Sequence, residues 1–139
     1  MPRVVAQGKL GNPPVDVFTN GEVGTLAVGD CVAISRTANN TVIRAVGDDM
    51  LKMPAIGFVQ KLVGTKAFIR TDRTLEDMTG IVRGDTYWVS PTVPGAITST
   101  APTPDDFSDP GMIQVVAQGR SNLGTIYVRV ELGSAILVG

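Results

Sequence analysis

GDCVAIS at positions 29–35 and GDTYWVS at positions 84–90 are two copies of one pattern. Each copy begins with a Gly-Asp pair, continues through mostly apolar residues and ends in serine. Glycine supplies the positive φ that a tight turn needs, and aspartate bonds to nearby backbone amides. Each copy therefore predicts a turn followed by a short β-strand, with Val32 and Ile34 on one face of the first strand and Tyr87 and Val89 on one face of the second. We expect those faces to be core.

The correspondence extends along the chain. The further matching segments are 56–59 with 113–116, and 64–70 with 124–129, the last with one residue less. The difference in residue number between matching positions increases along the chain, as insertions in loops would produce. The pattern predicts two repeated four-strand units, over residues 26–71 and 80–131. The alternative is that no structural duplication exists, because unrelated short strands with similar turn residues would give the same matches.

The rest of the sequence also favours strands. Sixteen glycines and nine prolines separate short runs that are rich in β-branched and aromatic residues. The runs are 24–28, 30–35, 41–45, 56–59, 66–70, 86–89, 112–116 and 125–130. We predict an all-β fold, a small β-barrel or β-sandwich of about eight short strands. The only plausible helical turns, at 48–52 and 74–78, are too short to form a layer.

Both ends of the chain differ from the repeats. Residues 1–23 are rich in glycine and proline and predict an extended N-terminal arm, with residues 24–139 forming a single β domain. The apolar residues that such an arm would place in a partner's shallow pockets are Val4, Val5, Val15, Val17 and Phe18. At the other end, Ile136, Leu137 and Val138 predict an additional strand or a subunit contact, because an apolar end is unusual on a free monomer.

The composition argues against an enzyme. The chain has no histidine, so the commonest general base and the commonest zinc ligand are missing. Its acidic pairs are Asp48-Asp49, Glu76-Asp77 and Asp105-Asp106, and we expect them to be solvated and not to form metal or catalytic sites. No glycine cluster has the spacing of a phosphate-binding loop. We therefore expect no catalytic residue, no metal and no cofactor.

Charge and hydropathy bear on the partners. Twelve basic and thirteen acidic residues give a net charge of -1, and the basic residues are scattered, so nucleic acid is not an expected partner. No apolar stretch is long enough to span a membrane, and the N-terminus lacks the apolar region of a signal peptide. Only 18% of the residues are charged, which leaves a surface that a partner could cover. Cys31 lies in an alternating apolar run and reads as a buried thiol.

The aromatic pair Tyr87-Trp88 lies in the centre of a predicted strand. Neighbouring strand residues point to opposite faces, so one ring faces inward and the other outward. We expect Trp88 in the core and Tyr87 at a wet edge, and a sugar-stacking Trp88 is the alternative.

Taken in order, several of these segments resemble the small capsid decoration, or cement, proteins of tailed bacteriophages and related modules of phage tail fibres. The segments are the Gly29-Asp30 strand, the Asn39-Asn40 turn, and residues 52–59, 84–90 and 94–102. The pattern spans residues 26–131. The sequence departs from it at Trp88, where tyrosine is usual, at Ala96, which replaces a second glycine, and at residues 114–118.

The resemblance implies a non-enzymatic virion protein, made in the host cytoplasm, that binds the capsid exterior. It would bridge neighbouring subunits of the major capsid protein, as a trimer or dimer that gains avidity from many copies. The N-terminal arm would add a strand to a capsid subunit's exposed edge. Two alternatives remain: a tail, fibre or baseplate module that binds host glycan or another tail protein, and a small all-β enzyme or metabolite-binding barrel with a carboxylate-lined pocket.

Overall fold

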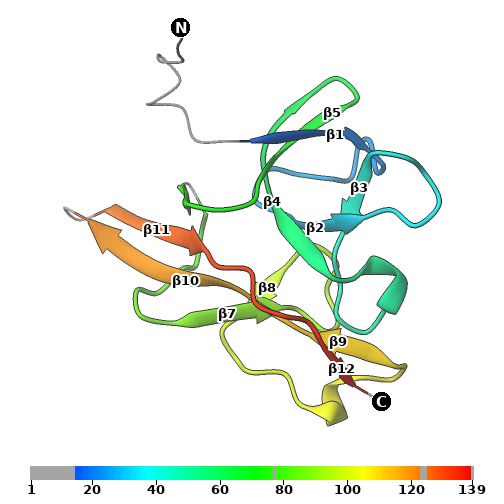
Figure 1. Ribbon diagram of the computed structural model, residues 1–139. Helices are drawn as coiled ribbons and strands as arrows, with labels where there is room; N and C mark the ends of the chain where they lie inside the picture. Colours follow the sequence, from blue (N-terminus) through cyan, green and yellow to red (C-terminus); the bar gives the residue numbers. More distant parts are fainter. Residues whose placement is uncertain (1–14, 77, 123–124, 139) are drawn as a thin grey trace, which may run out of the picture.

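A computed structural model describes residues 15–76, 78–122 and 125–138 of this chain (Figure 1). The described part is mostly β-structure, and its helices are the short 3-10 turns η2 (Met50–Lys52) and η3 (Pro104–Asp106). None of the helices in these ranges is long and apolar enough to cross a membrane. The prediction of an all-β fold is confirmed.

The first sheet closes on itself. Its strands are β1 (Asp16–Asn20), β2 (Cys31–Ile34), β3 (Thr41–Arg44), β4 (Ala55–Val63) and β5 (Lys66–Arg70), in the order β1-β3-β2-β4-β5. β1 completes the ring, because it pairs antiparallel with β5 and parallel with β3. The other pairs in this sheet are antiparallel.

The second sheet is open. Its strands are β6 (Thr74–Leu75), β7 (Thr86–Val89), β8 (Ile97–Thr98), β10 (Val115–Asn122) and β11 (Thr125–Val130), in the order β6-β11-β10-β7-β8. A third, two-stranded sheet joins β9 (Gly111–Ile113) to β12 (Ile136–Val138). The single barrel or sandwich of about eight strands expected from the sequence does not describe this arrangement, which has one closed sheet, one open sheet and one pair.

The two large sheets share a strand order. The order β3-β2-β4-β5 in the first corresponds to β8-β7-β10-β11 in the second, and β6 pairs with β11 as β1 pairs with β5. Gly29 and Gly84 have positive φ angles of 96° and 89° in equivalent turns, in which the amides of Asp30 and Asp85 bond to the carbonyls of Ala27 and Val82. Only the closing step differs: among the described strands, β6 and β8 do not pair as β1 and β3 do.

Apolar side chains form two clusters, and β2 belongs to both. Val32 is fully buried inside the closed sheet. Cys31 and Ala33, which point the other way along the alternating strand, are fully buried between the two large sheets. The cluster between the sheets also includes Phe58 from β4 and Tyr87 from β7. β2 is therefore buried on both faces, and its apolar run is nearly continuous, as expected for a central strand.

A buried amide also connects the two halves. The side chain of Gln114, 3% exposed, lies between β9 and β10. Its Oε1 accepts a hydrogen bond from the Ala55 amide at 2.8 Å, and its Nε2 donates to the Ala55 carbonyl at 3.1 Å and to the Gly133 carbonyl at 3.1 Å. The side chain thus pairs with the start of β4 much as a neighbouring strand would.

Four expectations need correction. The run 24–28 is not a strand, because residues 21–25 form a turn in which Gly24 has a φ of 88°, and Leu26 is the one buried residue of the run. The predicted arm, residues 1–23, is not an arm over residues 16–20, because β1 is paired on both edges and completes the first sheet. Tyr87 and Val89 are both buried, which confirms the predicted core face, whereas the expectation of Trp88 in the core and Tyr87 at a wet edge is wrong. The Tyr87 hydroxyl accepts the Val82 amide at 2.8 Å, and Trp88 is half-buried. Ile34 is 38% exposed at the end of β2 and is not a core residue, unlike Val32.

Candidate functional site

The residues predicted to contact a partner from the N-terminus have different environments. Val4 and Val5 lie outside the described residues. Val15 is half-buried, and Phe18 is half-buried against the cluster inside the closed sheet. Val17 is 45% exposed. Of the three that the structure describes, Val17 alone is exposed and open to a partner.

The C-terminal apolar residues form an exposed edge strand. Ile136 and Leu137 in β12 are each 64% exposed, and Val138 is half-buried. Successive residues of a strand point to opposite faces, so two consecutive exposed residues mean that both faces of β12 are open. One edge of β12 pairs with β9 through Ile136–Ile113 and Leu137–Met112, and among the described strands its other edge has no partner.

The rest of the chain holds this edge in place. The amides of Glu131 and Gly133 bond to the carbonyls of Val116 and Val115, which ties the segment before β12 to the start of β10. The Met112 amide in β9 bonds to the carbonyl of Gly47. In Figure 1, β1 lies in the upper part of the molecule and β12 lies at the lower end. The structure therefore does not bring the described members of the first predicted set, Val15, Val17 and Phe18, next to the C-terminal set.

A pocket of about 330 Å³ lies where the second sheet fails to close. Its walls are residues 28–30 before β2, residues 76, 78 and 79 after β6, and residues 95–97 leading into β8. β6 and β8 correspond to β1 and β3, the two strands that close the first sheet. The pocket thus occupies the position of the missing strand contact. Among its lining residues, Asp30 and Glu76 carry charge, and Met78 and Ile97 pack against the cluster between the sheets.

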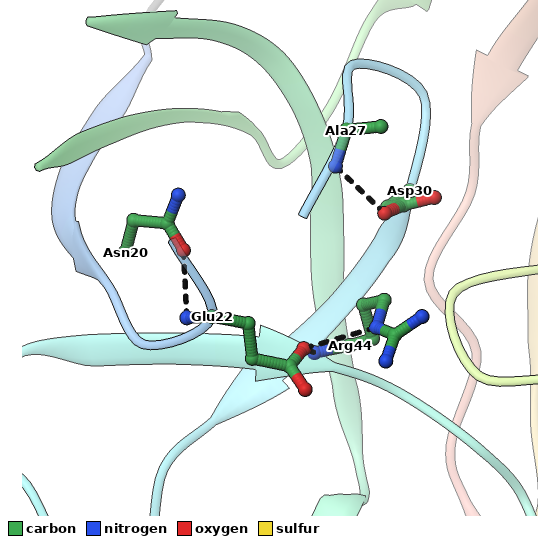
Figure 2. A network of polar contacts seen from close by, with 5 residues as sticks. All are labelled: Asn20, Glu22, Ala27, Asp30 and Arg44. Carbon is green, nitrogen blue, oxygen red and sulfur yellow. Dashed lines mark hydrogen bonds and ion pairs between the residues drawn. The ribbon is translucent and has the colours of Figure 1, made fainter. Parts of the chain in front are cut away.

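A polar network stands beside this pocket (Figure 2). Oε1 of Glu22 accepts hydrogen bonds from the backbone amide of Arg44 at 2.7 Å and from its Nε at 3.1 Å. The Glu22 amide in turn donates to Oδ1 of Asn20 at 2.7 Å. Oδ2 of Asp30 accepts from the Ala27 amide at 2.9 Å, so the expected bond from this aspartate back to its own turn is present.

Burial raises the pKa values of two neighbouring groups at the start of β2, Asp30 and Cys31. It raises the pKa of the Asp30 carboxyl above its ordinary value; the Ala27 amide and Arg44 oppose this shift, and Glu22 adds to it. Cys31 is fully buried, and its burial, together with the charge of Asp30, raises the pKa of the thiol to about 12. The expectation of a buried thiol is confirmed, and a thiol in this state is a poor nucleophile and a poor metal ligand.

The pocket brings together residues that no sequence pattern had grouped. No group of three or more His, Cys, Asp or Glu side chains that could hold a metal ion occurs among the described residues. Asp30 had been interpreted from the sequence only as a turn residue, and Glu76 only as part of a solvated pair. A Gly-Asp turn signals local geometry, whereas this pocket arises from three segments that are distant in sequence. No sequence pattern used above could have found it.

Comparisons with known protein families, with curated proteins and with solved structures found no match.

Proposed function

We propose that this chain is a non-enzymatic structural protein of a tailed bacteriophage that binds the outer surface of the capsid and bridges neighbouring major capsid protein subunits. The resemblance over residues 26–131 supports the class of protein. The exposed strand β12 supports the proposal structurally, because one of its backbone edges is unpaired among the described strands and it presents two large apolar side chains, Ile136 and Leu137. Hydrogen bonds from the preceding residues to β10 hold it in place.

An exposed edge strand can attach this chain to a partner protein. Exposed edge strands pair readily with other chains, and strand addition combines backbone hydrogen bonds with side-chain pockets. In this proposal β12 pairs either with a capsid subunit or with a second copy of the chain, and the repeated geometry of the shell multiplies a modest single contact. Part of the binding role first expected for the N-terminal arm thus passes to the C-terminal edge, because β1 is committed to the closed sheet.

Co-sedimentation with empty mature capsids of the encoding phage tests this function. The wild-type chain should bind saturably, at a fixed ratio to the major capsid protein. The double variant Ile136→Ser, Leu137→Ser should bind at least about tenfold more weakly. The matched control is Val63→Ser, Val93→Ser, which removes two other apolar side chains that are 50% and 56% exposed, and it should bind as the wild type does.

The outcomes separate the parts of the proposal. If the wild-type chain does not bind shells, the capsid function is refuted, and isolated tails become the particles to test for the alternative function. If it binds and the β12 variant binds equally well, the capsid function stands and the assigned surface is wrong. A variant lacking residues 1–14 leaves β1 intact and tests whether Val4 and Val5 contribute.

A further inference from the structure

The pocket beside Asp30 combines an apolar wall with unbalanced negative charge. Met78 and Ile97 line it and pack against the cluster between the sheets, while the carboxyl groups of Asp30 and Glu76 belong to two different walls. Oδ2 of Asp30 is bonded to the Ala27 amide, and no described residue donates to Oδ1. One oxygen of this carboxylate is therefore available to a guest.

The local cation does not cancel this charge. Arg44 acts on the Asp30 carboxylate, but its Nε is bound to Glu22 at 3.1 Å. Arg44 is thus shared between Glu22 and Asp30. Among the described residues, neither Asp30 nor Glu76 forms an ion pair. A site with excess negative charge and low-dielectric walls attracts a cation.

Two glycines shape the site. Gly95 has a φ of 79°, and a Cβ at this position would lie 3.0 Å from the Asp30 carboxyl group. Gly29 has a φ of 96°, and its Cβ position is 4.0 Å from Met78 Cγ. The absence of a side chain at Gly95 lets that segment approach the Asp30 carboxyl. At Gly29 a Cβ would make only an ordinary van der Waals contact, so the positive φ, and not lack of space, favours glycine there.

We infer that this pocket binds one basic side chain, arginine or lysine, of a partner protein. The methylene stem of such a side chain would lie along Met78 and Ile97, and its charged head would meet Asp30 and Glu76. Basic side chains combine an apolar stem with a charged tip in this way. Ca²⁺ and Mg²⁺ prefer six or more oxygen ligands, whereas the side chains of this pocket supply two carboxylates and an apolar wall. The inference does not depend on the capsid proposal.

A peptide titration followed by ¹H–¹⁵N NMR tests the inference. The probe is Ac-Gly-Arg-Gly-NH₂, and the matched control is the citrulline peptide, which has nearly the same shape and no charge. The arginine peptide should produce saturable shifts at residues 28–30 and 95–97, and the citrulline peptide should produce none at equal concentration. The lysine peptide should act as the arginine peptide does.

Two conservative variants locate the site. Asp30→Asn keeps an oxygen that can accept the Ala27 amide, and Glu76→Gln changes an exposed side chain, so both should fold. Each should weaken binding about tenfold, the loss expected for one charge-assisted hydrogen bond, while the exposed control Asp16→Asn should not. Unchanged spectra with the arginine peptide, equal shifts with citrulline, or full affinity in both Asp30→Asn and Glu76→Gln would each overturn the inference.

Discussion

Replacing Gln114 with alanine should lower the free energy of unfolding by more than the loss of one exposed hydrogen bond would. The substitution removes the acceptor for the Ala55 amide and the donor to the Ala55 carbonyl, and Ala55 is only 4% exposed. Each buried polar group left unpaired costs about 1–3 kcal/mol, so we expect a loss of about 2–6 kcal/mol. The third bond, to the Gly133 carbonyl, adds little because that residue is exposed to water.

This loss is large compared with the total stability of a small domain, about 5–15 kcal/mol. For a chain of this size, each kcal/mol corresponds to about 3–5 °C in Tm, so the Tm should fall by at least about 6 °C. Urea unfolding followed by fluorescence measures the free energy, and scanning calorimetry measures the Tm. The control is Gln118→Ala, in the same region of the second sheet, whose Oε1 accepts only an exposed bond from Arg120. It should change the stability by less than about 0.5 kcal/mol.

The variant Gln114→Glu tests whether the hydrogen bonds that the amide donates contribute to stability. A carboxylate can still accept the Ala55 amide, but it cannot donate to the Ala55 and Gly133 carbonyls and would place a negative charge against both. It should therefore be at least as destabilising as Gln114→Ala near neutral pH. If Gln114→Ala costs no more than Gln118→Ala, the amide does not hold the two halves together, and the reasoning is wrong.

Three further predictions concern Cys31, Asp30 and Gly95, which lie close together around the start of β2. Cys31 is fully buried with its pKa raised to about 12, so Ellman's reagent should react with native protein only at the rate of unfolding, and prompt reaction at pH 8 would contradict the structure. The native Asp30 carboxyl holds its proton more tightly than the unfolded one, because burial raises its pKa; the free energy of unfolding should therefore fall as the pH rises from about 4 toward neutrality. Asp30→Asn should remove that fall, so its stability relative to wild type should increase with pH in urea titrations, and a constant or decreasing difference would refute the assignment. Gly95→Ala adds a Cβ 3.0 Å from the Asp30 carboxyl at a φ of 79°. It should lower the free energy of unfolding more than Gly24→Ala does, because Gly24 has a φ of 88° but no atom within 4 Å of its Cβ position. Equal losses would show that backbone strain alone matters.

Most of the strands that were predicted correctly have enough consecutive apolar residues, whereas the predicted run at 24–28 begins with a turn at Gly24. The runs around Val32, Phe58 and Tyr87 lie in central strands, and their burial explains their composition. β1 was missed because Asp16 and Asn20 bound it and the preceding prolines favour an extended arm. Its strand conformation comes from partners on both sides, β3 and β5, which lie far along the chain.

Side-chain orientation was harder to predict than strand position. The alternation of side chains along a strand correctly predicts that Tyr87 and Trp88 point to opposite faces, but alternation alone does not decide which ring is buried. The Tyr87 hydroxyl is buried because the Val82 amide, at the start of the preceding turn, donates to it. β8 is only two residues long and carries no periodic signal, although it forms one side of the candidate pocket. A site built where sheets meet is therefore less visible in sequence than the sheets themselves.

The burial of β2 on both faces has a thermodynamic consequence. Because Val32 belongs to one apolar cluster while Cys31 and Ala33 belong to the other, neither cluster can come apart without exposing side chains of the same four-residue strand. The two halves should therefore melt in one cooperative transition, with equal calorimetric and van't Hoff enthalpies. A guest bound in the pocket beside Asp30 would then protect the closed sheet as much as the open one.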